Sequence, residues 1–153
     1  MLCALALTAL TATDVHAIHP EDRVTDWFKV RVTADAALPD GIAVGASLAP
    51  LPHVRIHAAA LTNVIGFGAR GGLQLVPFSD WVLHPIFSCD IGRYFTGRPI
   101  TYDFGTLNAG LELKVMRFEL ALLAGVSKVW TRGDYVLEAT LPSAKLALGV
   151  RLN

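Results

Sequence analysis

The sequence predicts an all-β protein, an eight-stranded antiparallel up-and-down transmembrane β-barrel. The first observation is alternation, because eight runs place apolar side chains at every second position. The second is composition: 53% of the 153 residues are hydrophobic and only 17% are charged, but no apolar run beyond the N-terminal segment is long enough for a membrane helix. The mean hydropathy of +0.47 agrees. The third is that aromatic residues gather near the ends of the runs.

The clearest pair of strands lies between Gly105 and Trp130. From Leu107 to Val115 every second residue is apolar, and a second alternating run begins at Phe118. Two residues, Met116 and Arg117, separate the runs. Period two with so short a gap predicts a tight antiparallel hairpin.

The other runs show the same period less strongly. Together with the central pair they cover residues 27–36, 42–49, 53–60, 67–75, 81–94, 105–115, 118–127 and 145–152. The fifth is the least regular, because Pro85 predicts a bulge or a break in it. Strands of this length are what a tilted membrane-crossing strand requires.

The connections between runs are predicted to differ at the two ends of the sheet. Those after the second, fourth and sixth runs are short turns, whereas residues 95–104 and 131–143 form longer loops after the fifth and seventh. Both chain ends fall on the short-turn side. This arrangement is typical of outer-membrane barrels.

The aromatic residues predict which way the apolar face points. Rings prefer the membrane–water interface, whereas a soluble barrel would bury them in the middle of its strands. Two girdles flanking an aliphatic band are therefore expected, and we assign to them Trp27, Phe28, Phe67, Trp81, Tyr94, Phe104, Phe118 and Trp130.

The opposite face of the runs is polar and predicts the filling of the barrel. An eight-stranded barrel has room inside only for side chains, and charges of both signs could pair there. The expected lumenal network consists of Lys29, Arg31, Asp35, Arg55, His57, Arg70, Gln74, Asp90, Glu112, Lys114, Glu119, Lys145 and Arg151. Interleaved glycines would relieve crowding on this face.

The N-terminal segment has the features of a secretory signal peptide. Residues 2–12 are apolar, and Val15-His16-Ala17 fits a cleavage site, although a basic start is missing. We therefore expect a signal peptide at residues 1–17 and a barrel domain at 18–153. The mature chain then keeps one cysteine, Cys89, so no internal disulfide is expected.

The sequence predicts no enzyme, cofactor or metal site. His53 and His57 stand four residues apart on a strand, about 13 Å by strand rise, which is too far for one ion. The longer loops carry no histidine to act as a base, and no nucleophile or phosphate-binding motif is present. The 13 basic and 13 acidic residues balance, so nucleic acid is not an expected partner.

The architecture from Trp27 to Asn153 resembles the small eight-stranded outer-membrane barrels of Gram-negative bacteria, the outer-membrane protein A and X type. The alternation of Leu146, Leu148 and Val150, with Gly149 and Leu152, resembles the assembly signal of that class, although Asn153 stands where an aromatic residue usually ends the chain.

The resemblance implies a place in the outer membrane, contact with its lipid and lipopolysaccharide, and insertion by the barrel-assembly machinery. It also implies a structural or surface-binding role for the extracellular loops. The loop residues expected to make contacts are Arg98, Tyr102, Asp103, Arg132, Asp134 and Tyr135. The alternative is a secreted, soluble, lipocalin-like barrel that binds an apolar ligand, with its apolar face inward.

Overall fold

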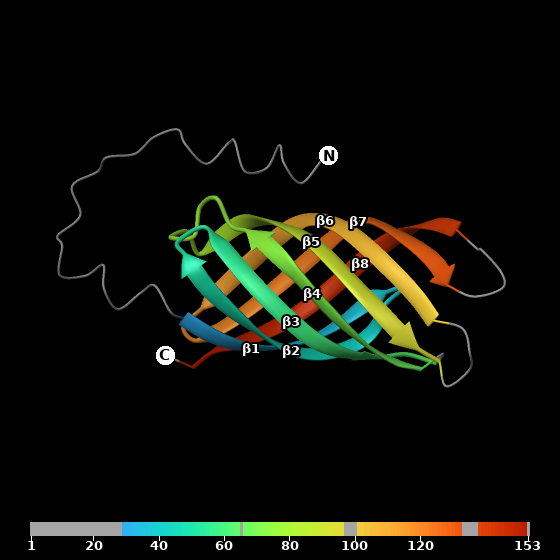
Figure 1. Ribbon diagram of the computed structural model, residues 1–153. Coiled ribbons are helices and arrows are strands. Elements are labelled where there is room, and N and C mark those ends of the chain that lie inside the picture. The colour runs from blue at the N-terminus through green and yellow to red at the C-terminus, as the bar shows by residue number, and fades with distance from the viewer. Residues whose placement is uncertain (1–28, 65, 97–100, 133–137, 153) are drawn as a thin grey trace.

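The computed structural model describes residues 29–64, 66–96, 101–132 and 138–152. Its eight strands close into one antiparallel up-and-down barrel in which every strand pairs with its neighbours in sequence and β1 pairs with β8 (Figure 1). The strands are β1 (Lys29–Leu38), β2 (Gly41–Leu51), β3 (Val54–Thr62), β4 (Phe67–Leu75), β5 (Leu83–Phe95), β6 (Thr101–Val115), β7 (Phe118–Arg132) and β8 (Glu138–Arg151). The predicted fold class is confirmed.

The predicted central hairpin is formed by β6 and β7. Its register is continuous from Thr101 opposite Arg132 to Val115 opposite Phe118. Met116 turns the chain with a φ of 56°, a left-handed value that a residue without β-branching tolerates in a tight turn.

The two ends of the barrel differ in their connections. The proximal end holds the start of β1, the end of β8 and the connections 52–53, 76–82 and 116–117, and the distal end holds 39–40, 63–66, 96–100 and 133–137. The expectation of short turns at the proximal end was wrong for residues 76–82, which span more of the chain than any distal connection. This segment folds over the proximal mouth, since Val76 is fully buried and donates its N–H to His53 O at 2.8 Å.

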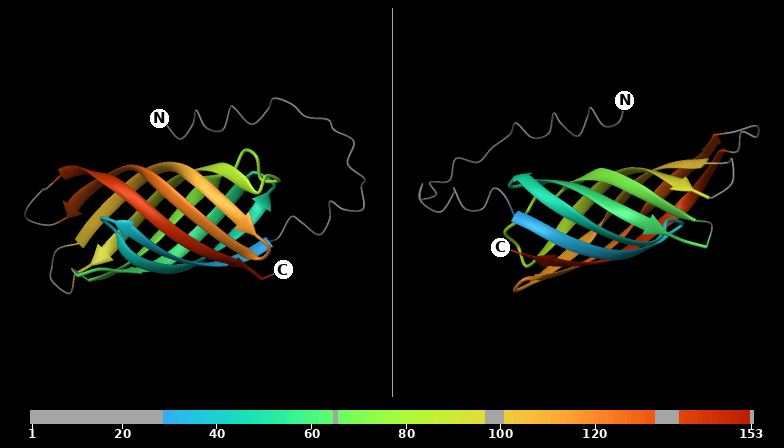
Figure 2. Two further views of the ribbon diagram at one scale, coloured as in Figure 1. Left: turned by 180° about the vertical axis from the view of Figure 1, so that it is seen from behind. Right: turned by 60° about the horizontal axis from the view of Figure 1, so that its bottom comes forward.

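The strands of one half of the barrel are longer than those of the other. β1 to β4 contain 9 to 11 residues, whereas β5 to β8 contain 13 to 15. The long strands project beyond the short ones at the distal end (Figure 2). The long loops predicted at 95–104 and 131–143 were therefore wrong, since the sheet continues into both segments. Their polar residues have little strand preference of their own, and pairing with the neighbouring strands makes them extend the sheet.

Two prolines lie within long strands without interrupting them. Pro85 in β5 pairs in register with Leu111, so the predicted bulge or break was wrong. The strand on the other side of β5, β4, ends opposite Phe87, so it does not reach Pro85. In the same way β1 ends opposite Ala144 of β8 and does not reach Pro142. Each proline has one neighbouring strand instead of two, the position in which a strand tolerates a missing N–H.

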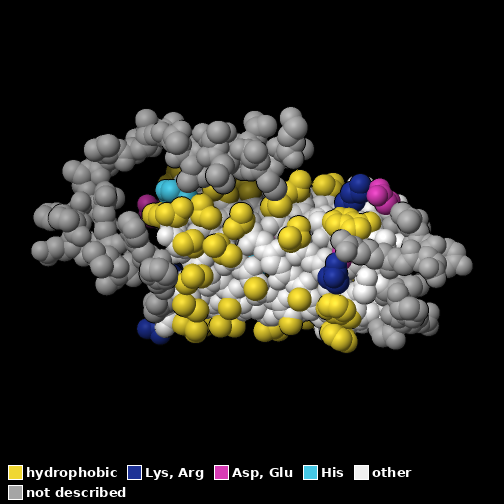
Figure 3. All heavy atoms as spheres, viewed as in Figure 1, with side chains coloured by type: hydrophobic (Ala, Val, Ile, Leu, Met, Phe, Trp, Pro, Cys, Tyr) yellow, Lys and Arg dark blue, Asp and Glu magenta, His cyan; other side chains and the backbone are white. Residues whose placement is uncertain are grey.

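The outer surface of the barrel is apolar. Large aliphatic side chains alternate along every strand and remain exposed, among them Val44, Ile56, Leu111, Leu122 and Leu148. The face seen in Figure 3 is covered by hydrophobic side chains, with the charged ones near its two ends. The polar face of each strand points inwards. No helix among the described residues is long and apolar enough to cross a membrane.

Candidate functional site

The residues expected to line the lumen lie on the inward-facing positions of the strands. Most are buried, while Lys29, Gln74, Lys114 and Arg151 at the proximal end are half-buried. They divide into a proximal network around Glu112 and Glu119 and a distal network around Arg70 and Asp90.

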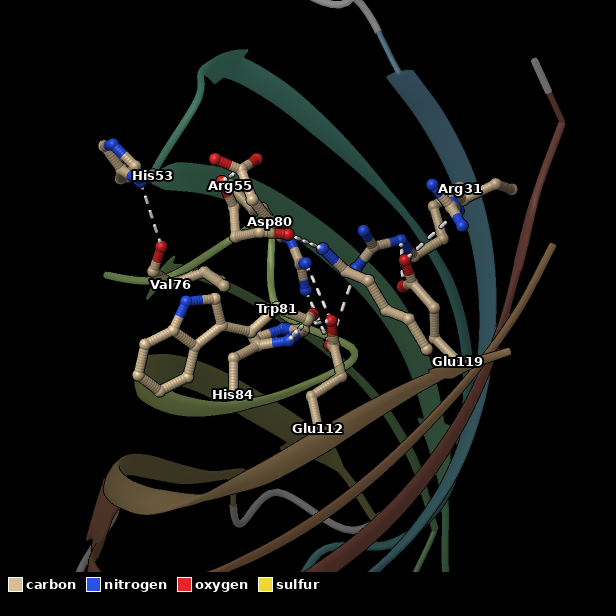
Figure 4. Close-up of polar contacts among 12 residues, drawn as sticks. Arg31, His53, Arg55, Val76, Asp80, Trp81, His84, Glu112 and Glu119 are labelled. Carbon is tan, nitrogen blue, oxygen red and sulfur yellow. Dashed lines mark hydrogen bonds and ion pairs between the residues drawn. The ribbon is translucent and has the colours of Figure 1, made fainter. Parts of the chain in front are cut away.

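Glu112 is the centre of the proximal network (Figure 4). Arg55 donates to both of its carboxylate oxygens, Nη1 to Oε2 at 2.6 Å and Nη2 to Oε1 at 2.7 Å. Arg31 Nη1 lies 3.7 Å from Oε2. This fork-to-fork geometry is the strongest ion-pair arrangement available to side chains, and burial protects it from screening by water.

His84 connects the network to the proximal connection. Its Nε2 lies 2.9 Å from Glu112 Oε1 and its Nδ1 lies 3.0 Å from Trp81 O. Both ring nitrogens of His84 therefore face oxygen atoms, one of a carboxylate and one of a main-chain carbonyl. Lys114 donates to Ser79 O of the same connection. His84 and Lys114 therefore hold the 76–82 connection against the proximal network.

Glu119 extends the network to the seam between the first and last strands. Arg31 Nε lies 2.6 Å from Glu119 Oε2, and Arg151 Nε lies 3.4 Å from Oε1. Since Arg31 belongs to β1 and Arg151 to β8, one carboxylate from β7 stabilises the pairing that closes the barrel.

The distal network contains more acidic than basic groups. Arg70 Nη2 lies 2.5 Å from Asp35 Oδ2, and its Nη1 lies 3.5 Å from Asp40 Oδ2. Asp90 lies 2.6 Å from His57 Nε2 and 3.4 Å from Lys145 Nζ. Gly72 makes room for this contact, since a Cβ there would lie 2.5 Å from Asp90 Oδ1 and 2.9 Å from His57 Cε1.

The two networks therefore differ in net charge. Leaving the histidines aside, the described inward-facing proximal groups are five basic residues (Lys29, Arg31, Arg55, Lys114, Arg151) and two acidic ones (Glu112, Glu119). The distal groups are two basic residues (Arg70, Lys145) and three acidic ones (Asp35, Asp40, Asp90). The lumen is therefore positively charged at its proximal end and slightly negatively charged at its distal end.

Tyr94 and Phe104 lie inside the barrel, so their assignment to the membrane girdle was wrong. They are 6% and 2% exposed, and their rings pack with centroids 5.6 Å apart. Tyr94 has the inward parity of His84 and Asp90 on β5, and Phe104 is inward because β6 starts earlier than predicted. With Ala43, Ala59 and Leu61 they form an apolar layer above the distal network.

A cavity of about 150 Å³ lies at the distal end of this layer. Residues of the short strands' connections form one side and residues of the long strands form the other. Its lining consists of Pro39, Asp40, Asn63, Tyr94, Tyr102, Phe104, Val129 and Leu141.

Asp40 connects the cavity to the distal network. It is 3% exposed, its main-chain carbonyl accepts a hydrogen bond from the Tyr94 hydroxyl, and its Oδ2 faces Arg70. Burial raises the pKa of this turn carboxyl above its ordinary value, and Arg70 acts in the opposite direction.

The remaining girdle residues that the structure describes lie on the outside. Phe67 pairs with Phe95 at the distal end with ring centroids 5.6 Å apart, and Trp130 is half-buried nearby. Phe118 and Trp81 are exposed at the proximal end, and Trp81 stacks on Phe78 at 4.7 Å. Trp27 and Phe28 lie outside the described residues.

The residues expected to make loop contacts are not gathered in loops. Tyr102 and Asp103 belong to β6: Tyr102 faces the cavity, and Asp103 is buried on the outer face with its Oδ1 2.5 Å from Arg93 Nε. As exposed loop groups these two predictions were wrong, because β6 begins at Thr101. Arg132 ends β7, while Arg98, Asp134 and Tyr135 lie outside the described residues.

Known structures share this architecture. The N-terminal β-barrel domain of OprF from Pseudomonas aeruginosa matches with a TM-score of 0.50 and 16% identity, covering 82% of this chain and 96% of that one. The de novo designed protein TMB2.3, solved by solution NMR, matches with a TM-score of 0.51 and 16% identity, covering 84% and 98%. Neither a family model nor a curated protein matches the sequence. At this identity the likeness establishes the fold, and it confirms the predicted resemblance to eight-stranded outer-membrane barrels.

Proposed function

We propose that this chain is an integral barrel of a Gram-negative outer membrane, with a structural or surface-binding role at its distal, extracellular end. The observation that carries the proposal is the inverted distribution of polarity: aliphatic side chains cover the outside and charges fill the inside. A bilayer stabilises that arrangement, whereas water does not. A soluble lipocalin-like barrel needs the reverse, with its aliphatic face inward around a ligand.

The expected partners follow from this placement. Outer-membrane lipid and lipopolysaccharide would cover the apolar surface, the barrel-assembly machinery would insert it, and residues 1–17 would direct its export. We further propose that the barrel is not an enzyme and does not bind nucleic acid. The charged side chains that fill the lumen and the 76–82 connection that Lys114 holds at the proximal end support a structural role over that of a wide pore.

Heat-modifiable gel mobility tests the proposal. Membranes from cells that express the full chain are dissolved in mild detergent and run with and without boiling. A closed membrane barrel should sediment with the outer-membrane fraction and change mobility on boiling. Recovery in the soluble fraction with no change in mobility would contradict membrane insertion and support the lipocalin-like alternative.

The surface-binding part needs its own experiment. A short epitope inserted within residues 133–137 should be labelled by antibody on intact cells, whereas the same epitope between Met116 and Arg117 should be labelled only after permeabilisation. The reverse pattern would contradict the proposed orientation.

A further inference from the structure

The distal cavity lies where the strands around it end at different levels. β1 ends at Leu38 opposite Ala144, so it does not reach Leu141 of β8, whose side chain lines the cavity. The connections 39–40 and 63–66 supply Pro39 and Asn63 on this side instead. Among the described lining residues none belongs to β1, β2, β3 or β4 themselves, and a space of about 150 Å³ remains between their connections and the long strands.

The lining of the cavity is almost wholly apolar. Tyr94 and Phe104 pack with ring centroids 5.6 Å apart, and Tyr102 and Val129 pack against the same layer. Rings and methyl groups provide dispersion contacts but no strong hydrogen bonds. They favour an apolar occupant over water, because a buried water molecule needs two or more polar partners.

The polar groups next to the cavity are engaged elsewhere. The Tyr94 hydroxyl donates to Asp40 O. Asp40 Oδ2 faces Arg70, and its Oδ1 is buried out of reach of solvent. Asn63 Oδ1 accepts a hydrogen bond from Gly66 N at 3.2 Å. A charged molecule would therefore lose its water in this cavity for few hydrogen bonds in return, which is unfavourable.

The volume sets the size of the occupant. An engineered protein cavity of about 150 Å³ lined by aliphatic and aromatic side chains stays dry and binds benzene, so one six-membered ring fits a space of this size. Pockets for drug-sized ligands begin at about 300 Å³, twice this volume. An empty apolar cavity also costs stability in proportion to its volume, so a molecule that fits it restores contacts that the folded chain lacks.

We propose that the distal cavity is a binding site for a small uncharged hydrophobic molecule of the size of one aromatic ring. Tyr94, Tyr102 and Phe104 supply aromatic contacts, and Val129 and Leu141 supply aliphatic ones. This binding activity goes beyond the structural or surface-binding role proposed above. It does not depend on that role, because the lining belongs to the barrel itself.

Benzene and the two-ring hydrocarbon biphenyl test the proposal by size. Each is titrated at fixed detergent concentration into the full-length barrel in micelles, while NMR shifts of the Val129 and Leu141 methyl groups are followed. Benzene should give saturable shifts, and biphenyl should bind about tenfold more weakly or less, because two rings exceed the cavity. Equal affinity for the two probes would overturn the proposal. Shifts that rise linearly with benzene and never saturate, as partition into the micelle alone predicts, would also overturn it.

Two matched substitutions on β7 locate the site. Val129→Phe places a ring inside the cavity and should abolish the saturable shift of the Leu141 methyl groups. Val126→Phe adds the same ring to the outer face of the same strand, where Val126 is 52% exposed, and should leave benzene binding unchanged. Partition of benzene into detergent is the same for both variants. Undiminished binding in the folded Val129→Phe barrel, or an equal loss in both variants, would contradict the site.

Discussion

The two ends of the lumen are built from the same strands but filled in different ways. At the proximal end, guanidinium and carboxylate groups interlock around Glu112 and Glu119, and the 76–82 connection covers them. At the distal end the filling changes to aromatic and aliphatic side chains, and a cavity remains. Charged pairs connect the strands at one end, whereas apolar packing around a cavity of about 150 Å³ fills the other. Substitutions at each end can test this difference, beginning with the largest expected effect.

Glu112→Gln should cause the largest loss of stability. It leaves Arg55, Arg31 and His84 buried without their shared carboxylate, and breaking a buried ion pair costs about 3–5 kcal/mol. The free energy of unfolding, measured by denaturant titration of the barrel in micelles, gives the value.

Glu138→Gln is the control for that substitution. It breaks the Lys128–Glu138 pair, which is 3.2 Å long but more than half exposed on both sides, so a loss below about 1 kcal/mol is expected. If both variants lose similar amounts, burial does not distinguish the proximal network from a surface pair.

Gly92→Ala should have an intermediate effect and act at the distal end. Its Cβ would lie 2.3 Å and 2.6 Å from ring carbons of Phe104, so the ring must move, at a cost of about 1–3 kcal/mol for overpacking. The expected loss is measured by the same titration. Gly105→Ala, whose Cβ would meet Trp130 at an ordinary 3.6 Å, should be nearly neutral.

A second substitution shows whether the ring is the cause. Adding Phe104→Leu to Gly92→Ala should recover part of the lost stability, because the smaller side chain leaves room for the new Cβ. A double variant as unstable as the sum of its single changes would mean that the clash lies with the backbone of β4 and not with Phe104.

The smallest effect concerns pH. Because burial raises the pKa of Asp40 above its ordinary 3.8, the folded chain holds this proton more tightly than the unfolded one. Its ionisation therefore lowers the free energy of unfolding as pH rises through the range just above 3.8. In Asp40→Asn this contribution is missing, so the variant should gain stability relative to the wild type over that same range. Parallel stability curves for the two proteins would contradict the shift.

Alternation in the sequence was enough to predict the number of strands, the barrel and the inward face. Arg55, Glu112 and Glu119 share the parity of the polar face, and a period of two leaves no other place for them. Which arginine would pair with which glutamate could not be predicted, because strand tilt and register bring together residues 57 positions apart, such as Arg55 and Glu112.

The distal end was predicted less well because strand ends are not marked by hydrophobic pattern. Tyr94 has the inward parity of its own strand, and that signal was available, but a ring near a strand end was assigned to the membrane interface instead. Phe104 became inward only because β6 begins at Thr101, an extension stabilised by pairing with β5 and β7. The cavity depends on these two assignments and could not be foreseen without them.

The unequal length of the strands also makes the distal rim of the barrel uneven. The long strands β5 to β8 stand on one side of the distal opening, and the low turns around Pro39 and Asn63 stand on the other. On the low side, the exposed Leu38, Ile42 and Phe67 mark the upper limit of the apolar surface. In the proposed membrane placement, lipid head groups would lie level with the turns of the short strands but below the ends of β5 to β8, so the two sides of the rim would meet different layers of the membrane surface.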